Sequence, residues 1–230
     1  MNKNSEDESI IKDIGLLITT YNRPKYVLKT FRSLKKSDLG FLRRIIIVDD
    51  GSNSKITLWL IKRFKVNNIR VDVIIKERDG NKIHTSMLKG WNILYKDDQI
   101  NFICNLDSDT IVKRYWLKEL KKIYLREKNG ENKILTGFNS NTHPVVDTYE
   151  DYYRKRSIGG LNMFFDKEVY TEIILPILES CKRILWDDYL VEKMKEENYY
   201  YLCTNPSVIQ HIGRKGIWSN YNRYDYAEDF

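Results

Sequence analysis

Cysteine is scarce in this chain of 230 residues. Cys104, Cys181 and Cys203 form an odd and widely spaced set that contains no CxxC pair. Disulfide frameworks and structural zinc sites both need cysteines that are paired or closely spaced. The sequence therefore argues against both kinds of scaffold and indicates a protein of a reducing compartment.

Long hydrophobic runs are also missing. The first 13 residues, MNKNSEDESIIKD, are polar and acidic and lack the apolar core of a signal peptide. No later stretch approaches the roughly 18 apolar residues that a membrane-spanning helix needs. We therefore expect a cytosolic protein without a transmembrane segment.

No single block of like charge accounts for the net charge. Lys and Arg number 39 against 32 Asp and Glu, which gives a formal charge of +7. This excess favours anionic partners such as phosphates, nucleic acid or a lipid surface. The basic residues are scattered in pairs and triplets, and solvated helix faces account for most of them. We expect no nucleic acid as a partner.

The chain does have the composition of a globular domain. Hydrophobic residues make up 42% and charged residues 31%, a balance that argues against long disorder. The length is that of one domain. We expect a single domain over residues 1–230, with a flexible lead of residues 1–13 and an aromatic tail of residues 214–230.

Apolar runs rich in Ile and Val alternate with longer, helix-periodic stretches. This alternation is typical of a parallel sheet flanked by helices, and it predicts an α/β fold. The polar and poorly periodic residues 139–157 predict a long loop over the ligand site. The predicted strands are residues 15–20, 44–48, 71–75, 100–106, 133–137 and 199–203, and helices are predicted from Pro24, at 57–64, 87–94 and 115–126, from Lys167, and at 188–196.

Acidic residues end two of the predicted strands. Asp49 and Asp50 follow the second strand, and Asp107 and Asp109 follow the fourth. In open α/β sheets the ligand crevice lies beyond the carboxyl ends of the strands, so these carboxylates stand where a ligand would bind. The DSD triplet can place two carboxylates on one Mg²⁺ or Mn²⁺ ion, which prefer oxygen ligands. It can equally be a solvated surface turn.

Three polar segments and one histidine admit both a structural and a functional interpretation. DDGS at residues 49–52 can be a plain turn or can present a carboxylate to a base N–H. TTYNRP at residues 19–24 can cap a helix, or can surround a base and its phosphates with hydroxyls, a ring and the cation of Arg23. WDDYL at residues 186–190 can favour the helix dipole or can supply a general base. His211 can be a structural histidine or a metal ligand.

Taken together, these segments resemble the family 2 glycosyltransferases and their relatives with the GT-A fold. Any one segment is modest evidence, whereas the ordered set, which spans nearly the whole chain, is strong evidence. The resemblance implies a GT-A type fold with a Rossmann-like, mostly parallel central sheet flanked by helices in a single domain. The matching segments are ITTYNRP (18–24), IIIVDDGS (45–52), NLDSD (105–109), IGGLNMFFDKEVY (158–170), WDDYL (186–190) and VIQHIG (208–213).

The resemblance also implies an activity. A hexosyltransferase of this family would move a sugar, with inversion, from a nucleotide-diphosphate donor to a hydroxyl of a glycan or glycoconjugate. A UDP-sugar is the expected donor, and Mn²⁺ or Mg²⁺ the expected cofactor. By the same resemblance Asp109 and His211 would bind the metal, and Asp107 would lie near the metal and the ribose. The metal would neutralise charge on the leaving nucleotide diphosphate.

Further roles follow from the same resemblance on the donor side. Thr19 and Tyr21 would border the nucleotide base, and Asp50 would accept a hydrogen bond from uracil. Lys82 is a looser match to a residue that contacts phosphate.

The acceptor side has two matching segments. Asp188 matches the catalytic base, and Asp187 is its alternative, because this chain has Asp-Asp where the family more often has Glu-Asp. Gly159 and Gly160 would let the backbone pass close to the donor sugar, or would form a plain turn before a strand.

Two alternatives are weighed against this interpretation. A sugar-nucleotide pyrophosphorylase normally has a glycine-rich, Arg-containing loop after its first strand, where this chain has TTYNRP. A non-catalytic module that binds nucleotide or nucleic acid has no need of a base, yet Asp109, Asp188 and His211 occur together. The sequence therefore favours the transferase.

Overall fold

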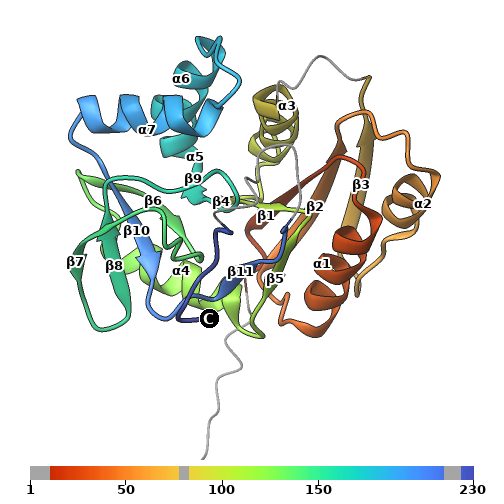
Figure 1. Ribbon diagram of the computed structural model, residues 1–230, viewed down its shortest axis with the longest axis horizontal. Coiled ribbons are helices and arrows are strands. Elements are labelled where there is room, and N and C mark those ends of the chain that lie inside the picture. Colours follow the sequence, from red (N-terminus) through yellow and green to blue (C-terminus); the bar gives the residue numbers. More distant parts are fainter. Residues whose placement is uncertain (1–10, 78–82, 215–223) are drawn as a thin grey trace, which may run out of the picture.

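The computed structural model describes residues 11–77, 83–214 and 224–230 (Figure 1). Most of the expected flexible lead (1–10) and the middle of the expected aromatic tail (215–223) lie outside the described residues, and so does Lys82. Within the described part, no helix has the length and apolar character needed to cross a membrane.

A sheet of nine strands runs through the centre of the protein in the order β3-β2-β1-β4-β9-β6-β10-β8-β7. Neighbours within β3-β2-β1-β4 pair in parallel, as do β6 and β10, while β9, β8 and β7 join the sheet antiparallel. The predicted α/β fold with a mostly parallel central sheet is confirmed. The strands are β1 (Ile14–Thr20), β2 (Leu42–Asp49), β3 (Arg70–Ile75), β4 (Phe102–Asp107), β6 (Asn132–Thr136), β7 (Val145–Thr148), β8 (Tyr152–Lys155), β9 (Phe164–Asp166) and β10 (Tyr200–Thr204).

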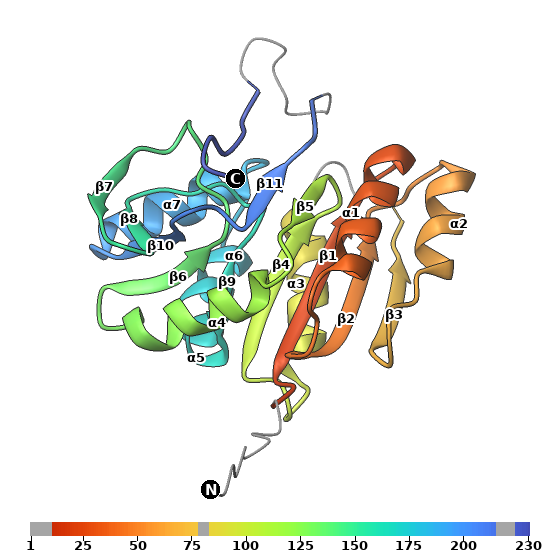
Figure 2. The same cartoon turned by 90° about the horizontal axis from the view of Figure 1, so that it is seen from below.

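Helices cover both faces of this sheet (Figure 2). Successive residues of a strand point to opposite faces, so Leu16 and Ile18 of β1 join one buried core and Leu17 joins the other. A strand that is covered on both faces must be apolar throughout, and β1 is buried along its whole length. One face carries α1 (Pro24–Lys36), α2 (Lys55–Arg63) and α4 (Trp116–Glu127), and the other carries α3 (Ile83–Tyr95), α5 (Lys167–Val169), a π-helical turn (Tyr170–Ile174), α6 (Leu175–Glu179) and α7 (Trp186–Glu196).

The connection from β1 to α1 turns sharply at the carboxyl end of the sheet. Pro24 occupies the first turn of α1, where its missing N–H leaves no hydrogen bond unmade. Val27, Phe31 and Leu34 recur on one face and anchor the helix in the core. Arg23, just before the helix, has a left-handed backbone with φ 61° and ψ 48°. The anchored helix therefore fixes the point from which the Arg23 side chain extends.

Two parts of the fold differ from the sequence prediction. The segment 139–157, predicted as a long loop, contains the hairpin β7–β8, which extends the sheet at one edge. β7 is mostly exposed and β8 is only four residues long, so the hairpin lacks the buried alternation by which strands are recognised. A second sheet, formed by β5 (Thr110–Val112) and β11 (Ile209–His211), is also absent from the prediction. Its strands are three residues long, too short for a periodic pattern.

Gly90 provides a test of the packing of α3 on β1. A Cβ atom at position 90 would lie 2.2 Å from Cδ1 of the buried Leu17. We expect Gly90→Ala to lower the free energy of unfolding by about 1 kcal/mol, because overpacking costs about 1–3 kcal/mol and alanine's helix propensity returns about 1 kcal/mol. Chemical denaturation measures the change. The control is Gly130→Ala, where an added Cβ atom has nothing within 4 Å, and stability should change by less than about 0.5 kcal/mol. Equal stabilities of the two variants would contradict this packing.

Candidate functional site

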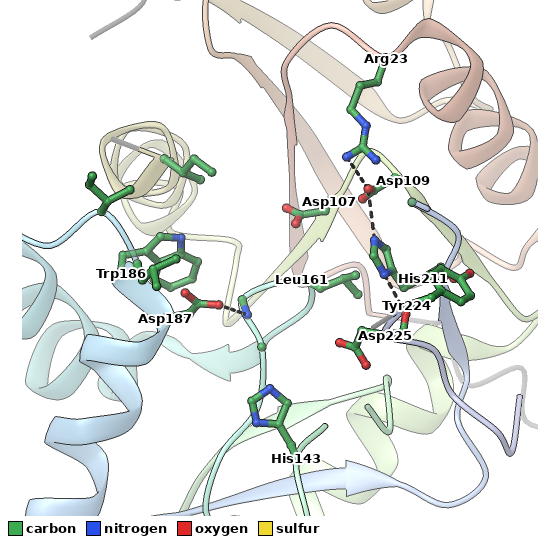
Figure 3. Close-up of a pocket in the computed structure, with 16 residues that line it drawn as sticks. Arg23, Asp107, Asp109, His143, Leu161, Trp186, Asp187, His211, Tyr224 and Asp225 are labelled. Carbon is green, nitrogen blue, oxygen red and sulfur yellow. Dashed lines mark hydrogen bonds and ion pairs between the residues drawn. The ribbon is translucent and has the colours of Figure 1, made fainter. Parts of the chain in front are cut away.

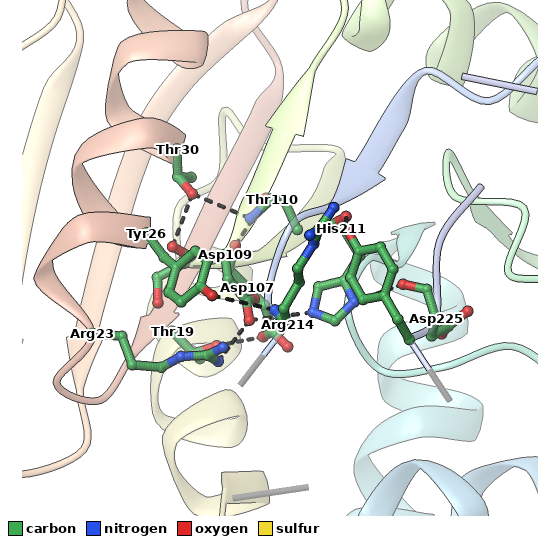
Figure 4. Close-up of polar contacts among 12 residues, drawn as sticks. Thr19, Arg23, Tyr26, Thr30, Asp107, Asp109, Thr110, His211, Arg214 and Asp225 are labelled. Carbon is green, nitrogen blue, oxygen red and sulfur yellow. Dashed lines mark hydrogen bonds and ion pairs between the residues drawn. The ribbon is translucent and has the colours of Figure 1, made fainter. Parts of the chain in front are cut away.

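The DSD triplet forms the turn at the carboxyl end of β4. Asp107 is the last residue of β4, and Asp109 directly precedes β5. Thr30 of α1 holds the turn, because its hydroxyl donates to the Ser108 carbonyl oxygen (2.8 Å) and accepts from the Thr110 N–H (3.2 Å) (Figure 4). The chain order of the sheet reverses between β1 and β4. The two carboxylates therefore lie at a switch point, where open α/β sheets bind ligands.

A short antiparallel ladder brings His211 to the DSD turn. β11 pairs with β5 so that His211 lies opposite Thr110, and the Ile212 N–H donates to the Asp109 carbonyl oxygen (2.8 Å). Nε2 of His211 then lies 3.3 Å from Oδ2 of Asp109. Nδ1 of the same ring lies 2.9 Å from the Asp225 carbonyl oxygen. A carbonyl oxygen can only accept, so Nδ1 carries a proton and Nε2 faces the carboxylate.

Arg23 and Gly213 complete the surroundings of Asp109. Nη1 of Arg23 lies 2.6 Å from Oδ2 of Asp109, the same oxygen that faces His211 (Figure 3). A Cβ atom at Gly213 would lie 2.0 Å from that oxygen and 2.7 Å from both the Arg23 Nη2 and the His211 Nε2. Only glycine leaves room for this arrangement.

The pKa values of the two carboxyl groups of the turn are shifted in opposite directions. Burial, and then the negative charge of Asp109, raise the pKa of Asp107 to about 7, although the Thr19 hydroxyl donates to its Oδ1 (2.9 Å). Burial also acts to raise the pKa of Asp109, but the hydrogen bond to His211 and the charges of His211 and Arg23 outweigh burial and lower it. Asp109 is therefore firmly ionised, whereas the charge of Asp107 is poorly compensated.

A pocket with a volume of about 350 Å³ opens beside this turn. Figure 3 shows Asp109 and His211 on one side of the pocket, with Asp187 and His143 across from them. The pocket therefore joins the parallel half of the sheet to the segments around β9 and α7. Its lining consists of Arg23, Ile83, Asp107, Asp109, His143, Gly159, Gly160, Leu161, Ile184, Leu185, Trp186, Asp187, His211, Gly213, Tyr224 and Asp225.

The two carboxylates of WDDYL lie in the first turn of α7. Asp187 lines the pocket, and its Oδ2 accepts a hydrogen bond from the Gly160 N–H (3.0 Å). Asp188 is exposed and lies outside this lining. Partial burial, and then the negative charge of Asp187, raise the pKa of Asp188. At Gly160 a Cβ atom would lie 2.5 Å from Cζ2 of Trp186, so the backbone can pass there only as glycine.

The two carboxylates of the DDGS segment, Asp49 and Asp50, have different hydrogen-bond partners. Asp49 builds the turn, because it accepts from the N–H (2.8 Å) and the hydroxyl (2.6 Å) of Ser52. Asp50 faces β3 and α3, where its Oδ1 accepts from the Ser86 hydroxyl (2.8 Å) and pairs with Nζ of Lys76 (3.2 Å). The sequence did not single out Lys76 or Ser86 as partners of Asp50.

The residues that the sequence selects are distributed unevenly around the pocket. Thr19, Tyr21 and Asp50 lie at the carboxyl ends of β1 and β2, outside the pocket lining, and Asp188 lies outside it at the start of α7. Lys82 lies outside the described residues. The selected residues that do line the pocket are Arg23, Asp107, Asp109, Gly159, Gly160, Asp187 and His211.

Among the pocket residues that were not selected from the sequence are His143, Tyr224 and Asp225. His143 lies in the segment that was expected to cover the site, and its Nδ1 is 2.9 Å from the Ser157 hydroxyl oxygen. The Tyr224 ring stacks on His211 with centroids 5.9 Å apart, and its hydroxyl donates to the His211 carbonyl oxygen (2.6 Å). Asp225 holds Nδ1 of His211 through its carbonyl oxygen. The aromatic composition of the C-terminal segment was the only signal for the last two.

Comparisons with known proteins agree with this architecture. The family model for glycosyl transferase family 2 matches residues 16–158. A search of curated proteins finds no match. Among solved structures, the crystal structure of S. aureus TarS is similar, with a TM-score of 0.58 and 17% sequence identity, over 82% of this chain and 36% of that one. The chain thus spans little more than a third of TarS, and at this identity the likeness shows the fold alone.

The contact between Asp109 and His211 can be measured through the pKa of the histidine. Burial acts to lower that pKa, but the hydrogen bond to Asp109 and its charge raise it above the ordinary value. Asp109→Asn removes the charge that favours the protonated ring, so we expect the pKa of His211 to fall. NMR titration can follow it, since the chain has three histidines. Asp187→Asn removes the same charge across the pocket and should shift this pKa much less. An unchanged pKa in Asp109→Asn would mean that the two side chains are not in contact.

Proposed function

Since the chain belongs to glycosyl transferase family 2 and is therefore a glycosyltransferase, we propose that it uses a divalent cation, Mn²⁺ or Mg²⁺, and a UDP-sugar. The sugar passes with inversion to a hydroxyl of a glycan or glycoconjugate. The observation that carries this proposal is the meeting of Asp109, His211 and Arg23 on one side of a pocket whose other side holds Asp187. One side suits a diphosphate and the other suits a base.

Asp109 and His211 have the chemistry and spacing of cation ligands. The described residues contain no group of three or more His, Cys, Asp or Glu that could hold a metal, but Mg²⁺-type sites often use one or two carboxylates together with substrate phosphates. Two ligands at right angles on a cation, with bonds of about 2.1 Å, stand about 3 Å apart. Oδ2 of Asp109 and Nε2 of His211 are 3.3 Å apart. Bound there, the cation would neutralise charge on the leaving diphosphate.

The donor fits across the carboxyl ends of β4, β1 and β2. Adjacent strands are about 4.8 Å apart, so the ends of β4 and β2 are separated by about 10 Å, roughly the reach from a diphosphate to its base. We assign the diphosphate to the Asp109 side and the base to Asp50, with Thr19 and Tyr21 between them. Lys76 and Ser86 both engage Oδ1 of Asp50. Both of these contacts use Oδ1, and we assign Oδ2 of Asp50 as the acceptor of the uracil N3–H.

The acceptor side must remove one proton. The acceptor oxygen forms a bond to the anomeric carbon as the bond from that carbon to the diphosphate oxygen breaks, and the hydroxyl proton passes to a carboxylate. A base opposite the diphosphate gives inversion. We assign this base to Asp188, whose carboxylate is exposed and has a raised pKa. Asp187 is the alternative, although the Gly160 N–H already occupies its Oδ2.

Binding of donor and cation can be tested by thermal unfolding. We expect UDP and Mn²⁺ together to raise the melting temperature far more than either does alone, because the diphosphate supplies the remaining ligands of the cation. At about 100 times Kd, a ligand adds about 2.7 kcal/mol, which is about 5–10 °C for a protein of this size. Asp109→Asn should abolish the shift, and CDP or ADP should give a smaller one. A full shift with UDP and a chelator would contradict the metal site, and no shift with any nucleotide would contradict the donor assignment.

The base can be identified from a matched pair of isosteric variants. Asp188→Asn should lower kcat for UDP release from a UDP-sugar by about 10²–10⁴-fold, the usual contribution of a general base, without changing the thermal shift by UDP and Mn²⁺. Asp187→Asn should reduce kcat less. It should also move the acidic limb of the pH–rate profile to lower pH, because it removes the charge that raises the pKa of Asp188. The reverse ranking of the two variants would assign the base to Asp187.

A further inference from the structure

Arg23 occupies the carboxylate oxygen that a cation would need. We propose that Arg23 exchanges partners when a divalent cation binds: without the cation the guanidinium holds Asp109, and with the cation bound it turns to the donor diphosphate. This inference rests on the cation site proposed above. It makes Arg23 a positioning residue in one state and a substrate-binding residue in the other.

The exchange follows from three groups that meet at one atom. Oδ2 of Asp109 lies 2.6 Å from Nη1 of Arg23 and 3.3 Å from Nε2 of His211. A cation bound between Asp109 and His211 would share that oxygen with the guanidinium. Two positive groups on one buried oxygen repel each other strongly. A Cβ atom at Gly213 would meet all three groups at 2.0–2.7 Å, so only glycine leaves room for them to lie together there.

Of the two partners in this ion pair, the arginine is the one that can move. The Asp109 side chain is 7% exposed and sits in a turn fixed by Thr30, whereas the Arg23 side chain is 30% exposed. The backbone on the N-terminal side of Arg23 is held by Asn22, whose N–H donates to the Ser52 hydroxyl (2.6 Å). The Arg23 guanidinium also lies over the Tyr26 ring, 4.7 Å from its centroid. A change of partner needs rotation of the Arg23 side chain, which already lines the pocket.

The ion pair also prepares the site for the cation. Nη1 of Arg23 holds Oδ2 of Asp109 at 2.6 Å, so the carboxylate already lies in the position that a cation requires. Cation and diphosphate both favour the state in which Arg23 is released, so each should increase the affinity for the other.

Mn²⁺ binding in the absence of nucleotide provides the first half of the test. Arg23→Gln removes the competing cation, and we expect it to bind Mn²⁺ about three- to fivefold more tightly than the wild type, the value of a partly exposed ion pair. The electron paramagnetic resonance signal of free Mn²⁺ measures this affinity.

The matched control is Arg214→Gln, which removes an equal charge nearby. The Arg214 guanidinium lies over the Tyr224 ring at 5.4 Å, and no ion pair links it to Asp109 in the described part of the chain. Its affinity for Mn²⁺ should stay within about twofold of the wild type, the lower end for an exposed charge.

UDP binding at saturating Mn²⁺ provides the second half. Arg23→Gln should weaken UDP binding about tenfold, the loss of one charge-assisted contact to phosphate, as measured by isothermal titration calorimetry. Arg23→Lys keeps a cation in reach and should retain most of the UDP affinity. Thermal melts without ligand establish that each variant folds.

The binding results of the wild type and of the variants decide whether Arg23 exchanges partners. An Arg23→Gln variant that binds Mn²⁺ no more tightly than Arg214→Gln overturns it, and so does one with unchanged UDP affinity. A wild-type protein that binds UDP but no Mn²⁺ overturns the cation site and the exchange together. A wild-type protein that binds neither ligand overturns the proposed donor as well, which separates failure of the exchange from failure of the function.

Discussion

The pairing of β5 with β11 brings together Asp109 and His211, the two residues proposed to bind the cation. Three residue pairs form this ladder, and they place His211 beside a carboxylate 102 residues earlier in the chain. A shift of one residue would turn His211 to the opposite face of the strand. Isolated ribbons of this size are marginal in water, so the ladder depends on Val112 and Ile209, which are buried in the core under α1 and α4. The core of the fold thus sets the register of the site.

The two halves of the sheet supply different parts of the site. The parallel strands β2, β1 and β4 end at one edge of the sheet, and this edge supplies Asp50, Arg23 and the DSD turn. The antiparallel strand β9 then joins β4 to β6, and the segment that leads into β9 brings Gly160 close to α7. Parallel strands buried on both faces are rigid, whereas the second half contains short strands and exposed connections. The proposed nucleotide site therefore lies on the parallel half, and the proposed acceptor side lies on the half with exposed connections, the kind of segment that varies most among proteins of one fold.

The sequence predicted the elements whose residues are close in the chain and missed the contacts between distant ones. The strands β1 to β4 and their helices follow from local periodicity, and the carboxylates at strand ends follow from the geometry of parallel sheets. The pairing of β5 with β11 and the hairpin β7–β8 leave no such pattern, because their residues are few or exposed. The ion pair of Arg23 with Asp109 and that of Lys76 with Asp50 depend on side-chain directions. Adjacent residues of a helix point about 100° apart, so sequence alone cannot decide which of Asp187 and Asp188 faces the pocket.

Opposite charges must lie in one small pocket here without cancelling each other. A group that binds diphosphate has to be cationic, and a base has to be anionic, so an ion pair between them would disable both. The structure keeps them apart by giving each a different partner. Arg23 and His211 share Asp109, whereas Asp187 across the pocket takes a backbone N–H from Gly160. A backbone N–H stabilises a carboxylate through a dipole and brings no second charge into the pocket. The requirement for glycine at position 160, set by the nearby Trp186 ring, therefore gives the Asp187 carboxylate, next to the proposed base Asp188, a partner other than the cationic groups around Asp109.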